Sequence, residues 1–206
     1  MTSILKADTI QDTDGNNIIN ENSNTITIGA SGDTISIPSG ATIANSGTAT
    51  GFGETNTPYF QAYRGSSEQT LGSASWTKIQ INTEVVDSAN AFDNSTNYRF
   101  TPTTSGKYFV YALTAMDTSA GNMRNAQTFI YKNGSELVRS FVNFHSSSGD
   151  DGEGASPTIS TIIDMNGSSD YLELYVNGDT VSGSTFNVQG NASIKQTIFG
   201  AYKIIT

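Results

Sequence analysis

The sequence predicts an all-β protein in which a short N-terminal stalk of β-repeats precedes a larger antiparallel β-sandwich. Charged residues make up only 14% of the chain. Gly, Ser, Thr and Asn fill most polar positions, and they favour turns and strands over helices. Isoleucine alternates with Thr or Ser near the N-terminus, and short strand-like runs separated by turn residues follow through the rest of the chain.

Composition limits the kinds of function to consider. The chain has 206 residues, ten Lys and Arg, 19 Asp and Glu, and no cysteine. A net charge of −9 with no basic cluster argues against nucleic acid as a partner. The lack of cysteine excludes disulfides and thiolate metal sites. We therefore expect stability to come from packing and from oligomerisation.

The first segment, residues 1–24, is polar and rich in Asp and Asn. Its first residues have neither a basic start nor an apolar run, so they predict no signal peptide and no membrane insertion. We expect synthesis in a cytoplasm; if the protein works outside a cell, release inside an assembled particle is one route that needs no signal. Residues 1–24 are then interpreted as the segment that attaches to that particle.

The second segment, residues 25–55, is interpreted as a stalk and neck. The pairs Ile26/Ile28 and Ile35/Ile37 alternate with Thr or Ser, which is typical of a strand with one apolar face. Strands this short cannot bury their isoleucines alone, so three chains are expected to wind into a trimeric β-helix or β-prism. A flexible Gly/Ser-rich linker is the alternative. The predicted stalk core contains Ile26, Ile28, Ile35, Ile37 and Ile43.

The third segment, residues 56–206, is expected to form the sandwich. Asn133-Gly134 lies between two apolar pairs and predicts a β-hairpin. Alternation along the run around Tyr108, Phe109 and Tyr111 predicts one buried face and leaves the other face able to lie at a subunit interface. The expected strands are Tyr59–Tyr63, Thr77–Ile81, Tyr98–Thr101, Gly106–Ala115, Ala126–Lys132, Leu137–Phe144, Pro157–Met165, Tyr171–Val176, Thr185–Val188 and Thr197–Ile205.

Several motifs of this segment, taken in order, resemble the globular head of complement component one q and its tumour-necrosis-factor-like relatives. They are Trp76–Ile79, Asn90–Asp93, Tyr98–Pro102, Gly106–Val110, Tyr131–Gly134, Asp170–Val176 and Thr197–Tyr202. The resemblance spans about residues 59 to 206. It implies a jelly-roll head that forms homotrimers, and it adds calcium as a candidate ligand because heads of that family often carry it.

The N-terminal segments are similar to the stalks of tail and head fibres from marine bacterial viruses, of the cyanophage type. Residues Ala7–Asp12 and Gly32–Gly40 carry this likeness. It implies a location in the virion, with the N-terminus bound to other virion proteins.

Candidate site residues gather in one acidic loop and beside it. Asp150, Asp151 and Glu153 stand among glycines and could offer oxygen ligands to calcium, although a solvated acidic loop is the alternative. The single histidine, His145, precedes this loop. We expect His145, Asp150 and Asp151 to face a receptor.

No catalytic residue and no bound cofactor are predicted. No Gly-x-Ser-x-Gly elbow accompanies His145. Asp170 and Glu173, three residues apart on an expected strand, would point to opposite faces and so could not act as a carboxylate pair. Trp76 is expected to pack against the core. The chain is therefore predicted not to be an enzyme.

These observations together predict a structural virion fibre whose trimeric head attaches to a host-surface glycan or outer-membrane component. One alternative is a non-adhesive decoration or structural protein of the capsid or tail. A polysaccharide depolymerase is a third interpretation.

Overall fold

The computed structural model describes residues 9–15, 17–29, 31–47, 56–65, 67–118, 121–144 and 152–204. The chain divides into two compact units, Met1–Thr50 and Gly51–Thr206. Strands, turns and irregular segments make up the described residues, and none of these is helical, which confirms the all-β prediction. No helix able to span a membrane was found within the same ranges.

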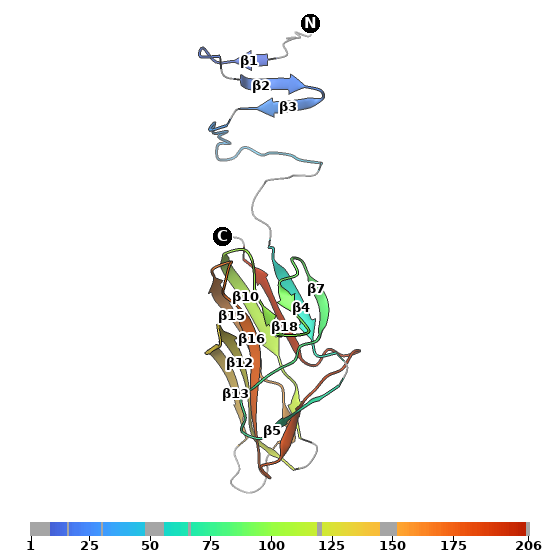
Figure 1. Cartoon of the computed structure of the whole chain (residues 1–206). Helices are drawn as coiled ribbons and strands as arrows, with labels where there is room; N and C mark the ends of the chain where they lie inside the picture. The colour runs from blue at the N-terminus through green and yellow to red at the C-terminus, as the bar shows by residue number, and fades with distance from the viewer. Residues whose placement is uncertain are drawn as a thin grey trace. The chain divides into compact units, whose positions relative to one another are not determined.

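The N-terminal unit contains one antiparallel sheet in the order β1–β2–β3 (Figure 1). Its strands are β1 (Thr9–Gln11), β2 (Asn17–Asn22) and β3 (Thr25–Ile28). Ser23 and Asn24 join β2 to β3, and both have positive φ, as a two-residue type I′ turn requires. Two of the three strands therefore lie in the segment that was interpreted as an attachment segment.

The predicted stalk isoleucines are exposed in the single chain. Only the first repeat forms a strand, β3, whereas Thr34–Ile37 forms none despite its alternation. The trimeric stalk core therefore remains a prediction. The exposed fractions are 68% for Ile26, 55% for Ile28, 59% for Ile35, 49% for Ile37 and 56% for Ile43.

The C-terminal unit, the head, is built from two main sheets (Figure 1). The first has the order β15-β10-β18-β4-β7 and is called the β10 sheet; the second has the order β13-β12-β16-β9-β8 and is called the β12 sheet. A smaller sheet has the order β14-β11-β17-β5, and β6 pairs with β16. The strands are β4 (Tyr59–Tyr63), β5 (Gln69–Gly72), β6 (Thr77–Lys78), β7 (Thr83–Asp87), β8 (Phe92–Asp93), β9 (Arg99–Phe100), β10 (Gly106–Leu113), β11 (Met116–Asp117), β12 (Met123–Lys132), β13 (Ser135–Asn143), β14 (Gly154–Ala155), β15 (Thr158–Met165), β16 (Leu172–Thr180), β17 (Thr185–Val188) and β18 (Ile198–Lys203).

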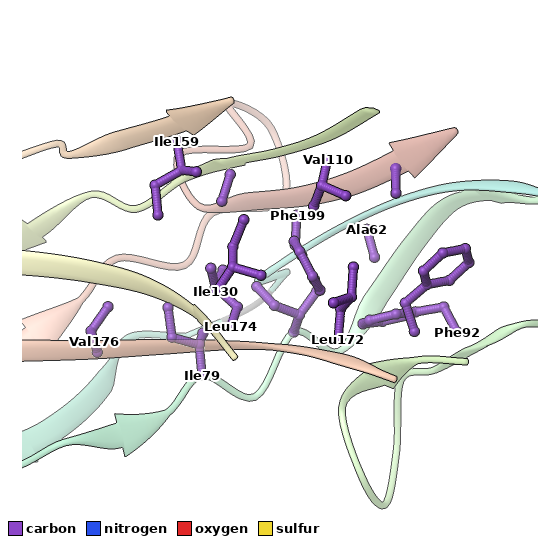
Figure 2. Packing of buried hydrophobic residues seen from close by; sticks show 14 of the residues in the cluster. Ala62, Ile79, Phe92, Val110, Ile130, Ile159, Leu172, Leu174, Val176 and Phe199 are labelled. Atoms are coloured by element: carbon purple, nitrogen blue, oxygen red, sulfur yellow. The ribbon is translucent and has the colours of Figure 1, made fainter. Parts of the chain in front are cut away.

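The head core lies between the two main sheets because every second residue of each central strand points inward. Figure 2 shows Val110 and Phe199 of the β10 sheet pointing into the same space as Leu172 and Leu174 of the β12 sheet. Phe60 stacks on the rings of Phe92 and Phe100 at centroid distances of 4.6 and 4.4 Å. Fully burying one such side chain contributes about 1.5–3 kcal/mol.

The Asn133-Gly134 hairpin forms as predicted. It connects β12 to β13, and both turn residues have positive φ. Asn177-Gly178-Asp179 lies within β16, which continues to Thr180. Gly178 is required there because a Cβ atom would lie 2.8 Å from the ring of Phe186.

Candidate functional site

The outward surface of the β10 sheet carries a row of large apolar side chains. Phe109 of β10 lies opposite Ile162 of β15 on one side and Tyr202 of β18 on the other. Tyr202 in turn lies opposite Tyr59 of β4. Residues directly opposite each other in a sheet share a face, so this row crosses four strands without a charged residue.

A second row runs beside the first, from Tyr111 across Gly200 to Gln61 and Val86. The Tyr111 ring lies over Gly200, where a Cβ atom would be 2.3 Å from the Tyr111 Cζ. The amide of Gln61 donates a hydrogen bond to the Tyr111 hydroxyl at 2.9 Å. The bare backbone at Gly200 therefore lets the Tyr111 ring lie flat on the sheet, where Gln61 holds its hydroxyl.

We call these two rows, without Ile162, the aromatic face. Tyr59 and Tyr202 border a shallow hollow of about 530 Å³ between the rows. Phe109 supports the hollow from the side, because its ring lies 5.3 Å from that of Tyr202. The aromatic face comprises Tyr59, Gln61, Val86, Phe109, Tyr111, Gly200 and Tyr202.

The aromatic face is uncharged at neutral pH. Burial raises the pKa of Tyr111, and the hydrogen bond from Gln61 offsets this only in part. The nearest ion pair on the sheet, Lys107–Asp164 at 2.8 Å, belongs to the next row, and both side chains are exposed. A continuous apolar surface of this kind is typical of a site where proteins associate, since exposure to water is unfavourable.

A second apolar surface lies where the edge strands β13 and β15 meet. Leu137 and Ile162 are 48% and 59% exposed there. They line a hollow of about 250 Å³ together with Val138, Ile163, Lys132 and Asp164. We call its three partly exposed apolar residues, Leu137, Val138 and Ile162, the apolar edge. Ile162 lies opposite Phe109, so the apolar edge adjoins the aromatic face.

Polar side chains fix the loop beside the apolar edge. Lys132 pairs with Asp170 at 2.8 Å and donates to the backbone carbonyl of Asp164 at 2.7 Å. The amide of Asn133 also donates to Asp170 at 2.8 Å. The hydrogen bond from Asn133, and then that from Lys132, lower the pKa of Asp170 to about 2.

Most of the predicted receptor-facing and metal residues fall outside the described part of the chain. His145, Asp150 and Asp151 lie there, so their roles remain predictions. Glu153 is exposed next to β14, and its backbone carbonyl accepts a hydrogen bond from Thr118. Within the described ranges, no group of three or more His, Cys, Asp or Glu residues is placed to hold a metal ion.

Other sequence predictions have clear outcomes. Trp76 does not pack into the core as expected; it is 58% exposed just before β6. Asp170 does not lie on a strand but precedes β16, where it is bound by Asn133 and Lys132. Glu173 is buried and pairs with Lys78 at 2.6 Å. Both carboxylates are thus engaged within the head.

The sequence identified only part of the aromatic face. Alternation on β10 indicated that Phe109 and Tyr111 could lie at an interface. It did not indicate Tyr59, Gln61 or Tyr202, which join them only through the register of β4, β18 and β10.

Comparisons with known proteins identify the fold of the head. No family model and no curated protein matches the sequence. The solved structure of Eiger TNF from S. frugiperda is similar, with a TM-score of 0.51 and 12% identity, over 71% of this chain and 93% of that chain. Murine APRIL at pH 5.0 has a TM-score of 0.50 and 10% identity, over 71% and 98%.

The globular domain of zebrafish complement 1qA is also similar at 11% identity, over 72% of this chain and 98% of that chain, with a lower TM-score of 0.48. At identities this low the structural likeness defines the fold alone. The likeness to Eiger TNF and APRIL agrees with the resemblance found in the sequence. The head of this chain has the jelly-roll fold of the tumour-necrosis-factor-like proteins.

Proposed function

We propose that this chain is the subunit of a homotrimeric viral fibre, in which the N-terminal unit forms the stalk and the head attaches to a host-surface receptor. The observation that carries the proposal is the aromatic face of the head. Tyr59 and Tyr202 remain 38% and 40% exposed on it in the single chain. Such a surface is explained most simply by association with further copies.

The proposed contact joins the apolar edge of one head to the aromatic face of the next. These are different surfaces of the same head, so the contact is heterologous and can close into a ring. The two surfaces are complementary, because the aliphatic side chains of Leu137 and Ile162 can pack into the hollow that tyrosines line on the next head. Three copies match the homotrimers that the sequence resemblance implies.

Light scattering of the full chain tests this assembly. We expect three times the 21.8 kDa of one chain. Tyr202→Asp places a charge in the aromatic face and should convert the trimer to monomers. The matched control is Trp76→Asp, which changes an exposed aromatic residue outside both surfaces and should leave the mass unchanged. A monomeric wild-type protein would refute the trimer.

The fibre part of the proposal is supported by the order of the chain and by the stalk resemblance. A repeat segment that precedes a compact head is the arrangement of a fibre whose tip is C-terminal. Three heads at one tip can engage a dense surface together, so weak single contacts become stable through effective concentration. No turnover is needed for this role, in line with the prediction that the chain is not an enzyme.

Two measurements separate attachment from the alternatives. Mass spectrometry of purified particles should detect the chain, and the isolated trimer should bind host cells. A chain that is present in particles but does not bind cells would indicate a decoration protein. Loss of host polysaccharide after incubation with the protein would indicate a depolymerase. Absence from particles would refute the virion role.

A further inference from the structure

The sheet of the N-terminal unit has a row of isoleucines on one face. Ile10 of β1 lies opposite Ile19 of β2, and Ile19 lies opposite Ile28 of β3. Opposed residues share a face, and Ile26 shares it with Ile28 because side chains alternate along a strand. We call Ile10, Ile19, Ile26 and Ile28 the isoleucine row.

Nothing in the described part of this unit covers the isoleucine row. Ile10 is 40% exposed and Ile19 is 37% exposed. No residue of the N-terminal unit whose exposure is described is buried. A three-stranded sheet becomes independently stable only when an apolar face is packed, so this one needs a covering surface.

The segment after β3 extends the same apolar surface. Ile35 and Ile37 alternate with polar residues as strand residues do, yet they lie in an irregular segment and are 59% and 49% exposed. Such a segment is free to pair with the same segment of another chain. Two separate parts of the unit are thus available to a partner chain.

We infer that the isoleucine row is the surface through which the N-terminal sheets of three copies pack against one another around a threefold axis. The inference rests on the proposed trimer, because three joined heads hold three identical sheets at high effective concentration. Three identical sheets whose isoleucine rows face one axis form a closed set, so that no row is left exposed. Ile10 and Ile19 then belong to the stalk core, and residues 9–22 are not a separate attachment segment.

The experiment uses the absence of cysteine from the sequence. Ile19→Cys places one thiol on the isoleucine row of the full chain. Ile18→Cys is the matched control, because Ile18 is the preceding residue, is 47% exposed and points to the opposite face. After mild oxidation we expect about tenfold more disulfide-linked dimer from Ile19→Cys, since a disulfide requires Cβ atoms about 4 Å apart.

A second pair of variants tests the inference without requiring disulfide geometry. Ile19→Asp should accelerate proteolysis within residues 9–47 by about tenfold relative to Ile18→Asp, because a buried unpaired charge would open the packed sheets. Faster cleavage of Ile19→Asp supports the inference even if cross-linking is equal. Equal cleavage overturns it.

Light scattering on the same samples separates this inference from the proposed function. Trimers whose Ile19 and Ile18 variants are cleaved equally would overturn the packing of the isoleucine row and leave the head trimer intact. A monomeric wild-type chain would overturn the proposed function, and the inference with it.

Discussion

The head and the N-terminal unit differ in the burial of their isoleucine side chains. In the head, Ile79, Ile81 and Ile130 are fully buried between two sheets. In the N-terminal unit, every isoleucine from Ile10 to Ile43 whose exposure is described is at least 37% exposed. Similar side chains thus form a core where one chain supplies two layers, and an open surface where it supplies a single sheet. We expect the head to fold alone and the N-terminal unit to depend on other chains.

The largest expected effect comes from the head core. Phe60→Ala should lower the free energy of unfolding of the head by about 3–5 kcal/mol, because Phe60 stacks on two rings and meets Phe199 at 5.1 Å. Urea unfolding followed by near-ultraviolet circular dichroism of the buried aromatic residues measures it. Phe141→Ala, at a site 51% exposed, is the control and should change little. An equal loss for both variants would contradict a single-chain core.

The second prediction concerns the point where core and interface meet. Gly200→Ala should lower stability by about 1–3 kcal/mol, because the new Cβ would displace the Tyr111 ring. The displaced ring should also disrupt the aromatic face, so light scattering should show dissociation on dilution. Gly72→Ala is the control, since its nearest contact would be 3.6 Å. A Gly200→Ala protein that remains trimeric on dilution would exclude Tyr111 from the interface.

The accuracy of the sequence predictions differed between central and edge elements. Strands such as β10 were predictable because Tyr108, Val110 and Ala112 alternate with outward residues against a buried face. The edge strand β7 was missed because Glu84, Val85 and Val86 are all exposed, so its sequence shows no alternation of polar and apolar residues. Edge strands with a single partner impose fewer constraints on their residues.

The candidate site was less predictable than the fold because it depends on contacts between distant segments. Tyr59 and Tyr202 are neighbours only through the pairing of β4 with β18. Trp76 was assigned to the core because large aromatics are usually buried, and a sequence carries no signal that one such side chain stays in solvent. The isoleucine row was half predicted: Ile26 and Ile28 alternate visibly, whereas Ile10 and Ile19 join them through register alone.

The third prediction is acid sensitivity that belongs to the head. The pKa of Asp170 is lowered to about 2 in the folded head, against about 3.9 for an unfolded aspartate. A carboxyl with a depressed pKa contributes stability above the unfolded value, and that stability is lost as pH falls through the folded value. Head stability should therefore decline between about pH 4 and pH 2, and less steeply in Asp170→Asn. If the melting temperature fell equally steeply with pH in the wild type and in Asp170→Asn, Asp170 would be excluded as a source of the acid sensitivity.

The smallest expected effect concerns salt, and it separates apolar from electrostatic assembly. Lys107 and Asp164 form an ion pair beside the aromatic face, but their side chains are 53% and 75% exposed, so the pair should contribute about 0–1 kcal/mol. Lys107→Met should therefore leave the light-scattering mass unchanged. Raising sodium chloride should leave it unchanged as well, because salt screens charges and does not weaken apolar contacts. Dissociation in high salt would show instead that charges at the border of the aromatic face hold the heads together.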